Sequence, residues 1–204
     1  RAHGGAGQNV GPAQGAPYEA VDLYGGHRTQ GAEDQVGQHP AAVVLEPDGV
    51  LDGIRSGAVL MDMSTVSPAT SRKLAGAVTT KQAEFVDAPV VGSKGPATAG
   101  TLVILVGGLP STLERVRPLL SAMGKTIIHA GGVGAGSALK LATNLMLAHL
   151  AAGFAEGLLL VQRAGLDPKK YLEGLDACTF RSPWYQTNGA GMIRSASMPS
   201  ASTS

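Results

Sequence analysis

Cysteine is nearly absent from this chain, and charge of one sign does not accumulate in it. The only cysteine among the 204 residues is Cys178, so no internal disulfide can form and a reducing compartment is permitted. No histidine lies near Cys178 in the sequence, which favours a core or surface thiol over a nucleophile. The formal net charge is +1 and the basic residues form no cluster, so no nucleic-acid-binding face is expected.

The sequence also lacks a recognisable targeting segment and a metal-ligand pattern. Its opening residues, RAHGGAGQNV, contain no apolar stretch typical of a signal peptide, and we expect a cytoplasmic protein. His3, His27 and His39 show no ligand spacing with cysteine or carboxylate, so no metal site is predicted.

Residues 1–40 have neither a strand nor a helix period and are rich in glycine and glutamine, which predicts an irregular or disordered segment. Gly5, Gly7 and Gly11 have a spacing similar to a dinucleotide-binding fingerprint. However, no apolar strand precedes them, and Pro12 breaks the helix that should follow. The spacing is therefore a weak indication of phosphate binding.

From residue 41 the pattern changes to regular alternation of short apolar runs with amphipathic segments. This alternation predicts an α/β fold with a partial Rossmann-type parallel sheet. The expected strands are 57–63, 83–89, 101–106 and 125–130, the expected helices are 67–82 and 111–123, and 90–96 is expected to be a flexible loop.

The stretch 131–165 is a glycine-rich turn that opens into one long, mostly apolar helix. It is long enough to span a bilayer of about 30 Å. Lys140, Asn144, His149 and Glu156 interrupt it on different faces, and charges inside a membrane are costly. We therefore expect a buried helix of a soluble protein that joins two domains or two subunits.

Beyond this helix, Asp167 and Pro168 predict the cap and first position of a further helix over 168–178. The expected organisation is an irregular segment, a partial dinucleotide-binding domain, the long helix with the start of a truncated all-α domain, and a disordered serine-rich tail. Their boundaries are 1–40, 41–133, 134–193 and 194–204.

Lys140 and Asn144 are the candidate catalytic pair, because residues four apart on a helix project from the same face. A lysine in an apolar helix ordinarily lays its stem along the surface and keeps its ammonium in water. The preceding glycines favour a site instead, since glycine lets a backbone approach a ligand closely and a helix start offers N–H groups to an anion. Gly134 and Gly136 are thus candidate cofactor-binding residues.

Ligands of parallel α/β sheets bind at the carboxyl ends of the strands. On this basis we expect three segments to surround one cleft: Ser64 with Thr65, the loop 90–96 and the turn 131–136.

Four motifs occur in the order typical of one enzyme family. They are DMSTVSP at 62–68, DAPVVGSKGPA at 87–97, GTL at 100–102 with VGG at 106–108, and GAG at 134–136 ahead of Lys140 and Asn144. Together they resemble the β-hydroxyacid dehydrogenases, which include 3-hydroxyisobutyrate dehydrogenase, tartronate semialdehyde reductase and the glyoxylate/succinic semialdehyde reductases. The resemblance covers about residues 41–193.

The resemblance implies an NAD- or NADP-dependent oxidoreductase that interconverts a small β-hydroxyacid and its semialdehyde or ketoacid. It assigns Lys140 as the catalytic lysine and Asn144 as its partner. It also places Thr65 near the nicotinamide, and Gly92 and Ser93 in the loop that holds the substrate carboxylate.

Both ends of the chain depart from the family. The opening strand with its G-x-G-x-M-G turn is absent, and the later helices are missing, so we expect a fragment of the fold. The residue that selects NAD or NADP normally follows the second strand of the missing part, so the sequence does not decide between the two cofactors. Nor does it identify the hydroxyacid. We also expect a homo-oligomer formed through the long helix. The alternative function is a non-catalytic helical oligomerisation module in which Lys140 is incidental.

Overall fold

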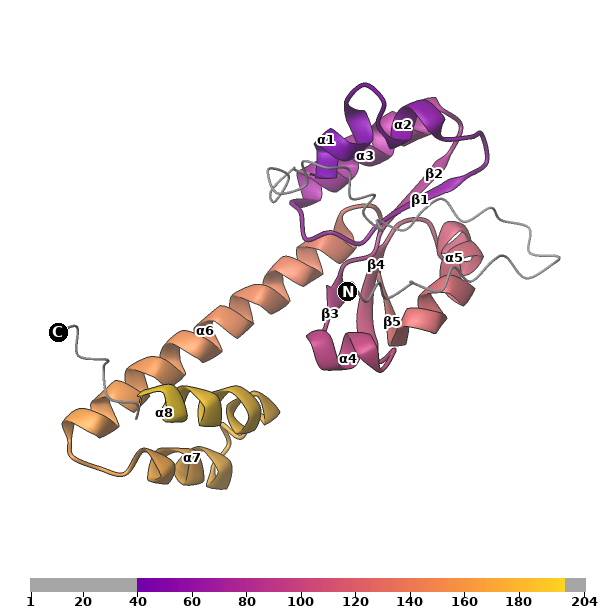
Figure 1. The fold of residues 1–204 in the computed structure, drawn as a ribbon. Helices are drawn as coiled ribbons and strands as arrows, with labels where there is room; N and C mark the ends of the chain where they lie inside the picture. Colours follow the sequence, from indigo (N-terminus) through magenta and orange to yellow (C-terminus); the bar gives the residue numbers. More distant parts are fainter. Residues whose placement is uncertain (1–39, 197–204) are drawn as a thin grey trace, which may run out of the picture. The chain divides into compact units, whose positions relative to one another are not determined.

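The computed structural model describes residues 40–196 of the chain (Figure 1). The Gly5, Gly7 and Gly11 spacing and the predictions for residues 1–39 and 197–204 lie outside the described residues. The chain divides into two compact units, and the first ends at Leu141 while the second begins at Ala142.

The first unit is built on a mixed sheet of five strands, with β1 and β2 parallel and β4 and β5 parallel. The strands are β1 (Val59–Asp62), β2 (Glu84–Asp87), β3 (Val90–Val91), β4 (Leu102–Gly107) and β5 (Gly124–Gly131). The order is β1-β2-β4-β3, and β5 also pairs with β4. The predicted α/β class with a Rossmann-type sheet is confirmed.

The sheet is not parallel throughout, because β4 runs antiparallel to both β2 and β3. Parallel neighbours need a crossover of about a dozen or more residues. The segment between β3 and β4 is shorter than this and contains only one short helix, α4 (Lys94–Thr98). The loop expected over 90–96 is also wrong, because β3 and α4 occupy most of this segment.

Helices pack on both faces of this sheet, because alternate residues of a strand face opposite sides. Phe85 lies in a core with α1 (Pro40–Leu45) and α3 (Pro68–Thr80), whereas Val86 lies in a core with α5 (Pro110–Met123). A short helix, α2 (Val50–Gly53), also packs near α1. α3 starts where Ser67 accepts a hydrogen bond from the Thr70 N–H, with Pro68 at its first position. The predicted helix start at Ser67 and Pro68 is confirmed.

The long helix, α6 (Ala135–Arg163), is continuous over 29 residues (Figure 1). By length and composition alone it could cross a membrane, yet only 11% of its most apolar window is buried. The expectation of a buried helix is therefore wrong for the single chain. Large apolar side chains remain exposed on it, namely Leu139, Leu141, Leu145, Met146, Leu147, Leu159 and Leu160.

The second unit packs the later part of α6 against α7 (Pro168–Ala177), a π-helical turn η2 (Tyr185–Gly189) and α8 (Ala190–Ala196). Its core is centred on Phe154, whose ring stacks on Tyr171 and Tyr185 with centroids 5.3 and 5.4 Å away. The carboxylate of Asp167 accepts a hydrogen bond from the Lys169 N–H at 2.9 Å. The predicted cap of α7 is confirmed.

Candidate functional site

The carboxyl ends of four strands meet in one row across the first unit. Asp62 pairs in register with Asp87, Asp87 with Gly107, and Gly107 with Gly131. β2 and β4 are antiparallel, but they pair only at their last residues, so their carboxyl ends still meet. The segments that follow β1 and β5 therefore both start from this row.

Asp87 connects the row to the start of α6. Its side chain is 1% exposed, and its two carboxylate oxygens accept hydrogen bonds from the backbone N–H groups of Gly134 and Ser137, both at 2.7 Å. The expectation that the start of α6 offers unpaired N–H groups to an anion is wrong for these two donors, because a protein carboxylate already binds them.

Sequence reasoning gave Asp87 no role beyond membership of a motif. One local signal was present: the residue before α6 is Gly134, which has no side chain to cap the helix. A helix that begins without a Ser, Thr, Asp or Asn cap must satisfy its first N–H groups elsewhere. Which distant residue does so depends on the strand pairing.

The glycines of the turn allow it to pack closely on its own fold. A Cβ at Gly136 would overlap the carbonyl oxygen of Leu105 and lie 2.9 Å from Oδ2 of Asp87. Gly134 has φ +89°, a conformation that favours glycine, and a Cβ there would lie 3.0 Å from Nη1 of Arg72. Close internal contacts thus account for both glycines, and their binding of a cofactor stays a prediction.

Lys140 lies one turn beyond Ser137 on α6 and is half-buried. The Oγ atoms of Ser137 and Ser71, both buried, lie 2.9 Å apart and tie α6 to α3. Asn144 follows one turn after Lys140 and is also half-buried. His149 is exposed, and its Nδ1 lies 2.8 Å from the Leu145 carbonyl oxygen of its own helix.

Thr65 is exposed, three residues beyond the end of β1. Before it, Oδ1 of Asp62 accepts a hydrogen bond from the Ser64 N–H at 2.9 Å, which shapes the turn. The other oxygen, Oδ2, is buried and has no hydrogen-bond partner among residues 40–196. A buried acceptor without a partner is costly, so this oxygen is suited to a ligand that brings a donor.

Gly92 and Ser93 do not lie at the row of carboxyl ends. Because β3 is antiparallel to β4, Gly92 emerges beside Leu102, at the amino end of β4, and a Cβ at Gly92 would lie 2.7 Å from the Leu102 Cδ2. The placement of 90–96 at this row of carboxyl ends is therefore wrong, whereas the expectation that the three segments surround one cleft stays a prediction. Both residues are exposed, and within the described part the Ser93 side chain makes no capping hydrogen bond to α4.

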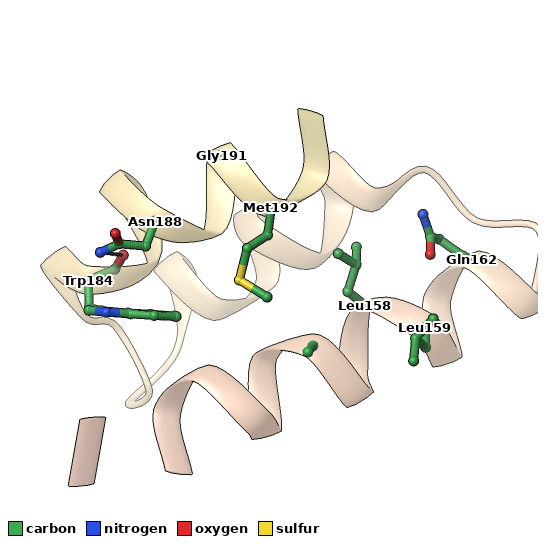
Figure 2. A pocket seen from close by; sticks show the side chains of 8 residues that line it. Leu158, Leu159, Gln162, Trp184, Asn188, Gly191 and Met192 are labelled. Carbon is green, nitrogen blue, oxygen red and sulfur yellow. Dashed lines mark hydrogen bonds between the residues drawn. The ribbon is translucent and has the colours of Figure 1, made fainter. Parts of the chain in front are cut away.

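A separate hollow of about 700 Å³ lies wholly in the second unit. Figure 2 shows Met192 reaching from α8 toward α6, between Trp184 and Leu158. None of the predicted site residues lines this hollow, and its walls are mostly apolar.

Two known families match this chain one after the other. Residues 35–132 match the NAD binding domain of 6-phosphogluconate dehydrogenase, and residues 134–203 match the NAD-binding domain of NADP-dependent 3-hydroxyisobutyrate dehydrogenase. The predicted cofactor class, NAD or NADP, is confirmed by these matches.

Individual relatives are also dehydrogenases and reductases. The chain is 41% identical to 3-hydroxyisobutyrate dehydrogenase of Pseudomonas aeruginosa, over 72% of this chain and 52% of that protein. It is 39% identical to the chloroplastic glyoxylate/succinic semialdehyde reductase 2 of Arabidopsis thaliana, over 75% of this chain and 43% of the relative. The structure resembles Mycobacterium tuberculosis 3-hydroxyisobutyrate dehydrogenase, solved with L-serine, at a TM-score of 0.64 and 34% identity, covering 68% and 48% of the two chains.

The chain spans about half the length of the curated relatives it matches. The two family matches together extend from residue 35 to residue 203, beyond the range 41–193 recognised from the motifs. The family resemblance read from the motifs is confirmed.

Proposed function

Since this chain belongs to the β-hydroxyacid dehydrogenase family, we propose that it serves an NAD(P)-dependent oxidoreductase that interconverts a small β-hydroxyacid and its semialdehyde or ketoacid. The observation that carries the proposal is the place of Lys140. It lies one turn beyond Ser137, whose backbone is bound to the row of strand ends by Asp87. The substrate class is a small carboxylate compound, and the location expected from the sequence is cytoplasmic.

Lys140 acts on the oxygen of the substrate. When bound, NAD(P) accepts or supplies the hydride at the reacting carbon. In the reducing direction charge develops on the carbonyl oxygen, and the Lys140 ammonium within hydrogen-bond reach donates a proton to it. In the oxidising direction Lys140 takes the proton from the hydroxyl. Asn144, one turn further on the same face, orients the substrate with its side-chain amide.

The residues at the end of β1 fit the nicotinamide end of the cofactor. The unpartnered Oδ2 of Asp62 can accept a hydrogen bond from a ligand hydroxyl or amide, and the exposed Thr65 hydroxyl lies three residues further along the chain. Gly134 and Gly136 would contribute the close-packed turn beside this end. A phosphate group would have to bind elsewhere than the N–H groups of Gly134 and Ser137, which Asp87 binds.

For the substrate carboxylate we keep Gly92 and Ser93 as the proposed residues. Their support is the family motif together with the exposed position of Ser93, whose hydroxyl makes no capping bond to α4 in the described structure. A hydroxyl and a backbone N–H of an exposed glycine are suitable donors for a carboxylate.

The test is a comparison of Lys140→Met with Lys73→Met. Turnover of NADPH or NADH with small semialdehydes and hydroxyacids is measured, together with binding of the dinucleotide. Loss of a general acid typically lowers kcat by about 10²–10⁴-fold, and we expect such a loss for Lys140→Met with dinucleotide binding retained. Lys73 is exposed on α3, so its replacement is the control. Normal turnover by Lys140→Met would contradict the assignment.

The alternative of a non-catalytic helical module is not supported, since the matched families and relatives are dehydrogenases and reductases. Self-association remains part of our proposal. The exposed leucines of α6 form an apolar surface that favours contact with another apolar surface. A bilayer is an unfavourable partner, because it would also have to accommodate Lys140, His149 and Glu156. We propose that a second copy of the chain covers the exposed face of α6.

A further inference from the structure

We propose that Asp87 is the positioning residue for Lys140. Asp87 is the last residue of β2, and its carboxylate accepts backbone hydrogen bonds at the start of α6, the helix that carries Lys140. The consequence for catalysis rests on the function proposed above, whereas the mechanical part of the inference does not depend on it.

The first turn of α6 has no cap of its own. Gly134 stands immediately before the helix, and the buried carboxylate of Asp87 replaces the missing cap from a strand 47 residues earlier in the chain. Both oxygens accept backbone N–H groups at 2.7 Å, one from Gly134 and one from Ser137. Hydrogen bonds to an ionised acceptor are about twice as strong as neutral ones, and a negative charge at a helix start is further stabilised by the helix dipole.

The carboxylate is also closely surrounded by backbone. A Cβ at Gly107 would overlap Oδ1 of Asp87 and lie 2.8 Å from the Gly136 nitrogen. A Cβ at Gly136 would lie 2.9 Å from Oδ2 of Asp87. The backbones of β4 and α6 thus lie close to the carboxylate, which is 1% exposed.

The anchored residue and the catalytic candidate lie on adjacent turns. Ser137 and Lys140 are three residues apart, so they lie about 4.5 Å apart along the axis and on neighbouring parts of the helix surface. A slip of α6 by one residue would rotate Lys140 by about 100° and shift it by about 1.5 Å. A misplacement of about 1 Å at a reacting group can cost about 10²-fold in rate.

A second contact of Ser137 supplies the matched control. Its Oγ pairs with that of Ser71 on α3 at 2.9 Å, in a buried neutral contact that leaves the backbone N–H to Asp87. Ser71→Ala removes this side-chain bond to the same residue and keeps the carboxylate. Asp87→Asn keeps the shape but places an NH₂ group against one of the two N–H donors, so one of the anchoring bonds is lost.

Steady-state kinetics of the full chain distinguish positioning from substrate binding. We expect Asp87→Asn to lower kcat about 10- to 100-fold while KM for the dinucleotide and the hydroxyacid changes less than about threefold, because only the reacting geometry is disturbed. Ser71→Ala is expected to retain kcat within about twofold. Unchanged kcat in a folded Asp87→Asn variant would overturn the inference, and so would an equal loss in Ser71→Ala.

A structural measurement tests the anchor without turnover. Spin labels are attached at Lys140→Cys and at Ser121→Cys on α5, in a Cys178→Ser background, and the distance between them is measured by pulsed electron spin resonance. Asp87→Asn should shift or broaden this distance, and Ser71→Ala should leave it as in the unsubstituted background. A distance that Asp87→Asn does not change would overturn the inference.

If Asp87→Asn does not fold, the proposed anchor is tested by measuring amide hydrogen exchange in the unsubstituted chain. The N–H groups of Gly134 and Ser137 should exchange slowly, since both are bonded to a buried carboxylate, and rapid exchange would overturn the anchor. The two proposals fail separately. No turnover by the unsubstituted chain, with labels that move in Asp87→Asn, refutes the proposed function and leaves the anchor standing. Turnover that Asp87→Asn does not alter refutes the anchor alone.

Discussion

Replacement of Gly136 by alanine should destabilise the first unit, although alanine is the better helix former. Gly136 lies in the first turn of α6, so helix propensity alone would favour alanine by about 1 kcal/mol. The structure opposes this gain, because a Cβ there would overlap the Leu105 carbonyl oxygen and lie 2.9 Å from both Oδ2 of Asp87 and the Gly107 nitrogen.

The steric cost should exceed the gain in propensity. The neighbours of the added methyl group are two backbones and a buried carboxylate held by two hydrogen bonds, none of which can turn aside. Overpacking of this kind costs about 1–3 kcal/mol, and the rigid surroundings place Gly136→Ala near the upper end. After subtraction of the propensity gain, we expect a net loss of about 2 kcal/mol.

Gly76→Ala is the matched control, since Gly76 lies inside α3 with nothing within 4 Å of the added Cβ. The same substitution in the same secondary structure should there stabilise by about 0.5–1 kcal/mol. Gly132→Ala, also in open space and three residues before the start of α6, should be neutral within about 0.5 kcal/mol.

The assay is urea unfolding followed by far-UV circular dichroism, with hydrogen exchange over peptides of β4. Tryptophan fluorescence is unsuitable, because Trp184 is the only tryptophan and lies in the second unit. A loss of 2 kcal/mol lowers the urea midpoint by about 1 M at a typical m-value. If Gly136→Ala is as stable as the unsubstituted chain, or stabilises it as Gly76→Ala does, the close approach of α6 to Asp87 and Leu105 is refuted.

Two further expectations concern the second unit and α6. Burial raises the pKa of the Tyr171 hydroxyl, so this hydroxyl ionises at lower pH in the unfolded chain than in the folded one. The neutral Tyr171 therefore contributes stability that is fully present below about pH 10 and is lost as pH rises through the folded pKa. Alkaline urea titrations of Tyr171→Phe should show a smaller loss above about pH 10, and an unchanged profile would contradict the assignment. Leu160 is 70% exposed on α6, so Leu160→Lys should weaken self-association in sedimentation velocity, whereas Leu109→Lys, 64% exposed before α5, should not. A monomeric unsubstituted chain would contradict the proposed assembly.

The sequence alone determined the features that depend on near neighbours. The apolar runs predicted the places of β1, β2, β4 and β5, because strand and helix periods are local properties. Ser67 with Pro68 and Asp167 with Pro168 predicted two helix starts, since a cap and the N–H it binds lie within three residues. The motif order sufficed for the family and the cofactor class, because it required no knowledge of which strands pair.

Only the tertiary structure decided the relations between distant segments. The antiparallel pairing of β3 placed Gly92 and Ser93 at the opposite end of β4, which no local pattern signals. The cap of α6 comes from Asp87, because strand register alone decides which carboxylate reaches a helix start far along the chain. The exposure of α6 was likewise not readable from its composition, since an apolar helix is buried only where the fold supplies a partner surface.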